Sequence, residues 1–140
     1  MIYIKGLSML IAVILLLTNC NDEQSIDQDL TGSWLFKESS GSLLGYVDAD
    51  PEHPEHLIFT QDGKVQKLRD GVVYFEYFYQ LIPAGAELEV QYRYDEKDDF
   101  MPFHKATISL DQLILTPYLG ENTHCADCPT EVYSRVISTE

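Results

Sequence analysis

The feature that most constrains the fold is a strict alternation of apolar and polar side chains over residues 86–94, AELEVQYRY. In an extended chain, the apolar residues from Ala86 to Tyr94 point to one side and the polar residues between them to the other. Alternation of this length predicts a half-buried β-strand with one face in water. Residues 72–81, VVYFEYFYQL, carry aromatic rings on both faces. They predict a strand that is covered on one side and partly covered on the other.

Shorter β-type segments surround these two strands, and no helical period persists for more than two turns. They are residues 32–37, 56–60, 64–68, 105–110, 113–116 and 131–137. Asp62-Gly63 and Asp70-Gly71 mark tight turns because glycine accepts a positive φ. Eight strands with mostly short connections predict an all-β fold, an eight-stranded antiparallel up-and-down meander. Such a meander closes into a small barrel, which removes its exposed edges.

The first twenty residues, MIYIKGLSMLIAVILLLTNC, have the layout of an export signal. Lys5 precedes an apolar run that is too short for a membrane helix, which needs roughly 20 apolar residues. Leu17-Thr18-Asn19-Cys20 resembles a lipobox, in which the cysteine becomes lipidated. We therefore expect a protein anchored to a membrane by acyl chains. The predicted parts are a signal peptide (1–19), the lipidated Cys20 with a flexible tether (20–29) and one domain (30–140).

The chain is strongly acidic, with a formal charge of −14. Removing Lys5 with the signal peptide leaves −15. This charge argues against nucleic acid as a partner and against a second, polybasic contact with anionic lipid. About 120 mature residues suffice for one domain with a real core but not for two.

Three short motifs, in this order and spacing, resemble a known family. They are Gly32-x-Trp34, Phe59-x-x-Asp62-Gly63 and Glu131-x-Tyr133-x-Arg135, and they span nearly the whole mature domain. In them the chain resembles the lipocalin-like domain lipoproteins of the Bacteroidetes type, which have a calycin-like β-barrel. The resemblance implies that Trp34 plugs the closed end of a lipocalin-like barrel and that Arg135 covers the tryptophan through a cation–π contact.

The residues after the lipobox bear on location. Asn21-Asp22-Glu23 resembles sorting signals that send lipoproteins to the outer membrane and often to its outer face. The predicted location is therefore the cell envelope, with the protein lipid-anchored at the outer membrane.

Two cysteines remain once Cys20 is lipidated, and they lie in His124-Cys125-Ala126-Asp127-Cys128. A disulfide between Cys125 and Cys128 is the expected state in an exported protein. A redox-active pair would need a helix N-terminus to lower the thiol pKa, and no helix follows Pro129. A Zn²⁺ or Cu⁺ site with His124 as a third ligand is a further alternative, although it has no evident fourth ligand.

A second candidate for metal binding is the acidic loop at residues 48–56, DADPEHPEH. Its prolines favour a polyproline II conformation, in which His53 and His56 share a face but lie about 9 Å apart. That distance is too long for one Zn²⁺ ion with bonds near 2 Å. We therefore interpret the segment as a solvated acidic loop, with a metal site as the alternative, and predict no cofactor.

Three functions remain open. The first is the binding of a small apolar or amphipathic molecule in the barrel, by aromatic residues that could line a pocket: Tyr74, Tyr77, Phe78, Tyr79, Tyr92 and Tyr94. The second is an interaction module of the envelope whose barrel is filled by side chains. The third is a metal or redox-stress lipoprotein that uses the Cys125 and Cys128 pair. The sequence contains none of the common catalytic motifs, so we predict that it is not an enzyme.

Overall fold

The computed structural model describes residues 29–43, 45–121, 123, 125 and 127–137. The predicted signal peptide, Cys20 and most of the tether lie outside these residues, as does His124. Within the described part of the chain, no helix is long and apolar enough to span a membrane. The described residues form nine strands: β1 (Gly32–Ser42), β2 (Gly45–Asp48), β3 (Glu55–Phe59), β4 (Lys64–Arg69), β5 (Val72–Ala84), β6 (Glu87–Arg93), β7 (Met101–Ser109), β8 (Gln112–Pro117) and β9 (Thr130–Arg135).

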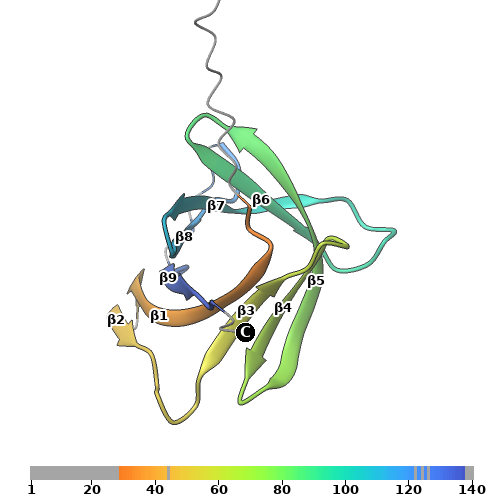
Figure 1. Cartoon of the computed structure of the whole chain (residues 1–140). Helices are drawn as coiled ribbons and strands as arrows, with labels where there is room; N and C mark the ends of the chain where they lie inside the picture. Colours follow the sequence, from red (N-terminus) through yellow and green to blue (C-terminus); the bar gives the residue numbers. More distant parts are fainter. Residues whose placement is uncertain (1–28, 44, 122, 124, 126, 138–140) are drawn as a thin grey trace, which may run out of the picture.

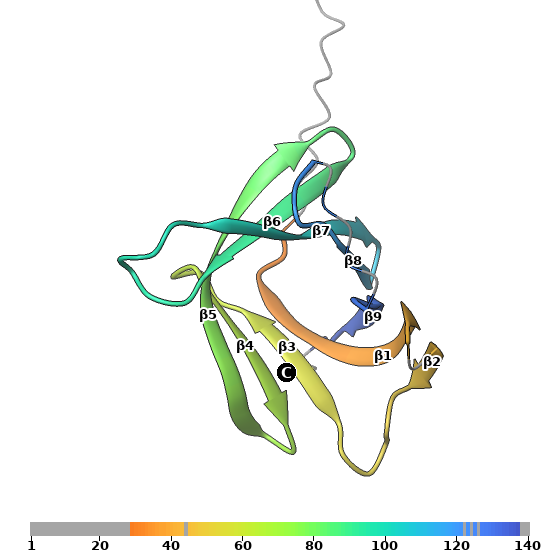
Figure 2. The ribbon, with the colours of Figure 1, turned by 180° about the vertical axis from the view of Figure 1, so that it is seen from behind.

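The strands form one antiparallel sheet that closes on itself (Figure 1). From β3 to β9 each strand pairs with the next along the chain, and β1 closes the barrel by pairing with both β3 and β9. Trp34, for example, lies opposite Leu57 on β3 and Arg135 on β9. The view from behind shows β1 between these two neighbours (Figure 2). The predicted fold, an eight-stranded antiparallel barrel, is confirmed, with β2 as an additional strand.

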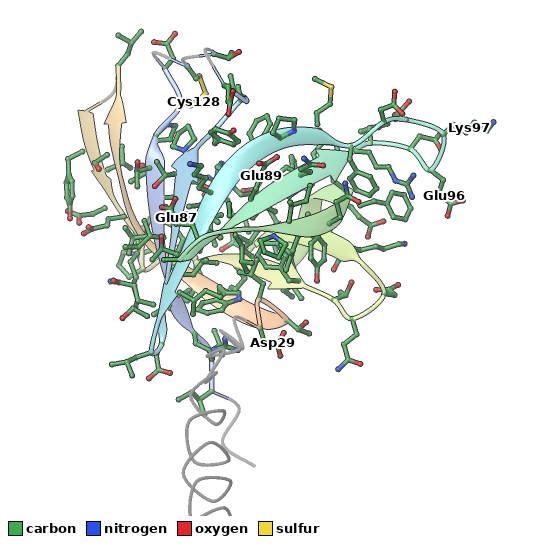
Figure 3. All side chains as sticks on the ribbon, turned by 90° about the horizontal axis from the view of Figure 1, so that it is seen from above. Asp29, Glu87, Glu89, Glu96, Lys97 and Cys128 are labelled. Carbon is green, nitrogen blue, oxygen red and sulfur yellow. A yellow bond between two sulfur atoms is a disulfide. The ribbon has the colours of Figure 1, made fainter. Side chains whose placement is uncertain are left out.

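The two ends of the barrel differ. Both ends of the described chain lie at one end, together with the short turns 60–63, 85–86 and 110–111. The longer connections 49–54, 94–100 and 118–129 lie at the other end, which we call the mouth. Asp29 and Cys128 mark these opposite ends (Figure 3). The N-terminal tether therefore joins the barrel at the end away from the mouth.

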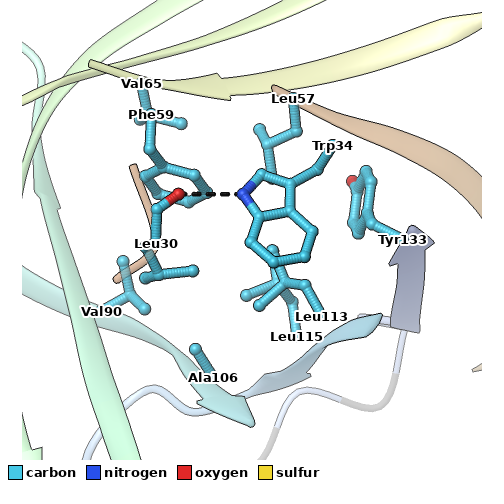
Figure 4. Close-up of a cluster of buried hydrophobic side chains, with 10 residues drawn as sticks. All are labelled: Leu30, Trp34, Leu57, Phe59, Val65, Val90, Ala106, Leu113, Leu115 and Tyr133. Carbon is cyan, nitrogen blue, oxygen red and sulfur yellow. Dashed lines mark hydrogen bonds between the residues drawn. The ribbon is translucent and has the colours of Figure 1, made fainter. Parts of the chain in front are cut away.

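The end opposite the mouth is closed by the hydrophobic core around Trp34, which is fully buried. The indole Nε1 donates a hydrogen bond to the carbonyl oxygen of Leu30 at 2.9 Å (Figure 4). The Arg135 guanidinium lies 4.2 Å from the ring centre and donates to the carbonyl oxygens of Asp29 and Thr31. The core residues come from most strands: Leu30, Trp34, Leu57, Phe59, Val65, Val90, Ala106, Leu113, Leu115 and Tyr133.

Alternation along β5 and β6 orients their side chains as the sequence predicts, with one exception. On β6, Val90 is fully buried and Leu88 and Tyr92 pack against the core. On β5 the register shifts by one residue, because Leu68 pairs with Val73 and Lys67 pairs with Phe75. Tyr74 is left without a partner in this β-bulge, which changes the facing of the residues before it. Val73, which strict alternation would place on the same face as Phe75 and Tyr77, is consequently exposed.

The sequence did not predict two parts of the sheet. β2 has four exposed residues and no apolar face to be recognised. β7 begins at Met101, four residues before the predicted start. The sequence did not predict this part of the strand because a proline, here Pro102, is uncommon in a strand interior. The structure accommodates this proline next to a register shift between Val90 and Gln91 on β6, where the regular pairing is interrupted.

Candidate functional site

A cavity of about 470 Å³ opens at the mouth of the barrel. Its size falls within the range of small-molecule sites in proteins. Residues of β3 to β9, of the connection after β6 and of the loop before β9 line it: Leu57, Val65, Lys67, Phe75, Tyr77, Tyr92, Arg93, Tyr94, Phe103, His104, Leu115, Asp127, Cys128, Pro129 and Glu131. The barrel is thus filled at one end and hollow at the other.

The cavity has an apolar floor. Leu57, Val65 and Leu115 line it and belong at the same time to the buried core. They lie on β3, β4 and β8, and each is exposed by 2% or less. A ligand that entered from the mouth would therefore meet the upper surface of the core around Trp34.

Aromatic rings form a connected wall of the cavity. Tyr77 on β5 contacts Phe75, Tyr92 and Tyr94, with ring centres 4.0, 6.5 and 5.5 Å apart. Tyr92 on β6 in turn packs edge-to-face against Phe103 on β7 at 5.7 Å. The wall arises because Phe75 and Tyr77 on one strand, and Tyr92 on the next, share the inner face of the sheet. It offers apolar ring faces, with phenol groups at some edges.

One ion pair lies in the cavity wall. Lys67 Nζ on β4 is 3.0 and 3.2 Å from the two carboxylate oxygens of Glu131 on β9. The Tyr133 hydroxyl donates to the same carboxylate at 2.9 Å. Burial, followed by the negative charge of Glu131, raises the pKa of Tyr133 well above its usual range. Tyr133 therefore stays protonated and remains a hydrogen-bond donor.

His104 on β7 adds a polar group with a shifted pKa. Burial lowers its pKa to about 4, while the nearby Glu131 carboxylate opposes the shift. The ring is therefore neutral at pH 7. Its Nδ1 lies 3.2 Å from the hydroxyl of Tyr92, whose own pKa is raised by burial. A protonated phenol and a neutral imidazole can share this hydrogen bond, with the phenol as donor.

Arg93 lies at the edge of the cavity and fixes the 94–100 connection. Its guanidinium lies 5.4 Å from the ring centre of Phe78 and 4.5 Å from that of Phe100. Its Nη1 donates to the carbonyl oxygen of Glu96 at 2.8 Å. Its Nε is buried and has no hydrogen-bond partner among the described residues. Stacking between two rings thus takes the place of an ion pair for this cation.

Three of the six aromatic residues proposed from the sequence line the cavity, namely Tyr77, Tyr92 and Tyr94. The other three lie elsewhere. Tyr79 points inward but packs edge-to-face on Phe59 beside the core at the closed end. Phe78 lies on the outer face of β5, next to Arg93 and Lys64, because neighbouring residues of a strand face opposite sides.

Tyr74 also lies outside the cavity, within the β-bulge of β5. Its ring is 53% exposed, and its hydroxyl donates to Glu55. The sequence reasoning missed Phe75, Phe103 and His104. Phe75 alternates with Tyr77 and Tyr79 along its strand, so the alternation of side chains could have identified it as a lining residue.

The candidate metal ligands have separate partners. His53 Nδ1 lies 3.0 Å from Asp70, whereas His56 Nδ1 lies 3.5 Å from the Ser33 hydroxyl. Cys125 and Cys128 are at disulfide distance, with their Cα atoms 5.4 Å apart, and Cys128 lines the cavity. Among the described residues, no group of three or more His, Cys, Asp or Glu side chains is arranged to hold a metal ion.

Fold and site together define a small closed antiparallel β-barrel with a plugged end and an aromatic cavity at its mouth. The chain matches no protein-family model, no curated protein and no solved structure.

Proposed function

We propose that this chain is a lipid-anchored protein of the cell envelope, at the outer membrane, whose barrel binds a small apolar or amphipathic molecule. The cavity at the mouth is the observation that supports it, since about 470 Å³ is left open above an otherwise packed core. Its wall is mostly apolar and aromatic with a few polar groups, as in most small-molecule sites.

The position of Asp29, where the described chain begins, fits this proposal. An acyl chain on Cys20 would hold the barrel through the segment that enters beside Asp29, at the closed end. The tether of residues 21–29 spans at most about 30 Å when extended. The mouth would then face away from the lipid surface, and a ligand could enter it from the aqueous side.

Native mass spectrometry of the mature chain without its lipidated cysteine, residues 21–140, tests the binding function. This chain contains the complete barrel with its own core. We expect it to carry an organic molecule of a few hundred daltons that is lost on unfolding. A bound metal ion, or a bare protein that also fails to bind apolar dyes, would contradict the proposal.

A pair of variants on one strand places the binding in the cavity. Tyr77→Ala removes a central ring of the cavity wall, whereas Tyr74→Ala removes the same side chain from an exposed position on the same strand that does not line the cavity. With an environment-sensitive naphthylamine dye as the probe, we expect about tenfold weaker binding for Tyr77→Ala. Tyr74→Ala is expected to bind like the unaltered protein. Equal losses in the two variants would argue against this cavity.

The anchor has a separate test. Cys20→Ala in the full-length chain removes the acceptor for the acyl chains. We expect the protein to leave the membrane fraction, because a signal peptide and a polar tether alone supply no stable contact with lipid. Unchanged fractionation of Cys20→Ala would contradict the anchor and leave the binding proposal standing.

A further inference from the structure

We propose that the ligand of this cavity is an organic cation, a molecule with an apolar body and an amine or quaternary ammonium group. The inference rests on the proposed binding function and names the class of molecule bound. Three independent features carry it: exposed aromatic faces at the rim, the pairing of the cavity's own lysine, and the charge of the mouth.

Exposed aromatic faces lie where a charged group would sit. The floor formed by Leu57, Val65 and Leu115 is buried and apolar, so the apolar body of a ligand would pack against it. At the rim, Tyr94 is 75% exposed and Phe103 is 46% exposed, yet both line the cavity. Ring faces that remain open beside a cavity attract cations through the negative potential above the ring.

The positive charges already present in the lining have partners. Both carboxylate oxygens of Glu131 lie against Lys67 Nζ, so this lysine is not free to receive an anion. The Arg93 guanidinium, at the edge of the cavity, lies between the rings of Phe78 and Phe100 and donates to the carbonyl oxygen of Glu96. His104 is neutral at pH 7, because burial lowers its pKa to about 4. An anionic head group would therefore face the carboxylates of Glu131 and Asp127, while Arg93, which has no carboxylate partner among the described residues, is held at the edge of the cavity by its two rings.

The charge of the molecule is concentrated around the mouth. Four of the connections at this end, residues 49–54, 70–71, 94–100 and 118–129, hold nine carboxylates and one lysine. The carboxylates are Asp50, Glu52, Asp70, Asp95, Glu96, Asp98, Asp99, Glu121 and Asp127. The turns at the closed end hold Asp62 and Asp111, and the start of the described chain adds Asp29 there. An excess of negative charge around the mouth raises the local concentration of cationic ligands and repels anions.

The test compares three amphiphiles with the same eight-carbon chain, namely octyltrimethylammonium, octanol and octanoate. Each displaces the naphthylamine dye from the mature chain, and the dissociation constants are compared. We expect the cation to bind about tenfold more tightly than octanoate in about 0.02 M salt, with octanol in between. The preference should shrink in about 0.5 M salt, because screening weakens the field of the mouth.

Two variants and a matched control locate the preference. Tyr94→Leu keeps an apolar side chain but removes the ring, so we expect two- to fivefold weaker binding of the cation and unchanged binding of octanol. Asp127→Asn removes one charge from the cavity lining and should also reduce the preference for the cation. Asp111→Asn removes the same charge at the closed end and should have no effect.

The outcomes separate this inference from the proposed function. If the dye binds but octanoate or octanol competes as well as the cation, or none of the three competes, the inference is overturned and the binding function stands. If the dye and all three amphiphiles fail to bind a folded protein, the binding function itself fails.

Discussion

At the scale of single residues, Arg135 is expected to be the most important cation for stability. Its guanidinium covers the Trp34 ring at 4.2 Å and bonds two backbone carbonyls of the N-terminal segment. We expect Arg135→Met to lower the free energy of unfolding by about 2–4 kcal/mol, since a covered cation–π contact and two charged hydrogen bonds are lost. Urea unfolding, followed by the fluorescence of the single tryptophan, measures it.

A matched arginine supplies the control for this prediction. Arg69 also lies near a ring, 5.9 Å from the centre of Tyr74, but its side chain is 59% exposed. We expect Arg69→Met to leave the urea midpoint nearly unchanged, because exposed ion pairs are screened by water. Arg135→Lys should restore part of the loss. Equal effects of Arg135→Met and Arg69→Met would show that the contact of Arg135 with Trp34 adds no more stability than the exposed contacts of Arg69.

His104 predicts a pH dependence of stability. Its pKa falls from an ordinary 6.5 to about 4 on folding, chiefly because of burial. Between these values the unfolded state binds a proton that the folded state does not, so stability rises with pH from about 4 to 6.5. The full effect is on the order of 3 kcal/mol.

An NMR titration of the His104 ring measures this pKa directly. Urea unfolding at about pH 5 and pH 7 measures the consequence, and His104→Gln is expected to flatten the difference between the two. A His104 pKa near its ordinary value, or an unchanged pH dependence in His104→Gln, would contradict the prediction.

Residues that line the cavity differ in how far the sequence predicts them. Alternation within one strand places Tyr77, Tyr92 and Tyr94 on an inner face, and this follows from the pleat alone. The pairing of Lys67 with Glu131 could not be predicted in this way. The two residues are 64 positions apart, and they meet only because β9 returns to close the barrel.

At the scale of elements, the sequence predicted the strands that have one buried face, but it did not predict β2. Periodicity reports the burial of alternate side chains, and every residue of β2 is exposed. β2 is held by its pairing with the second half of β1, beyond the residues of β1 that pair with β3. Pairing without burial leaves no signal in the pattern of apolar residues.

The same lack of burial predicts that β2 opens more readily than the other strands. We expect its amide protons to exchange with solvent fastest among the nine strands, since local opening there exposes almost no apolar surface. Hydrogen exchange followed by NMR, residue by residue, measures this. The amides of Trp34 and Leu35 on β1, which pair with both neighbouring strands, serve as the internal reference. Equal protection of β2 and this part of β1 would contradict the prediction.

At the scale of the whole molecule, the two ends of the barrel have separate tasks. The Trp34 core and the Arg135 cover stabilise the closed end, while the cavity, the acidic loops and the cysteine pair belong to the mouth. Changes at the mouth should therefore alter binding more than stability. The Cys125–Cys128 pair is a sharp test of this division, because a disulfide can affect both.

We expect the double variant Cys125→Ser, Cys128→Ser to lose at most about 2 kcal/mol of stability, since the bridge closes a loop of only four residues. Its Trp34 fluorescence spectrum should stay unchanged, because the core lies at the other end of the barrel. Dye binding should weaken several-fold, because Cys128 and Pro129 line the cavity and would no longer be held by the bridge. Unchanged binding would show that the bridge does not hold the cavity wall, whereas a loss of folding would show that the two ends are not independent.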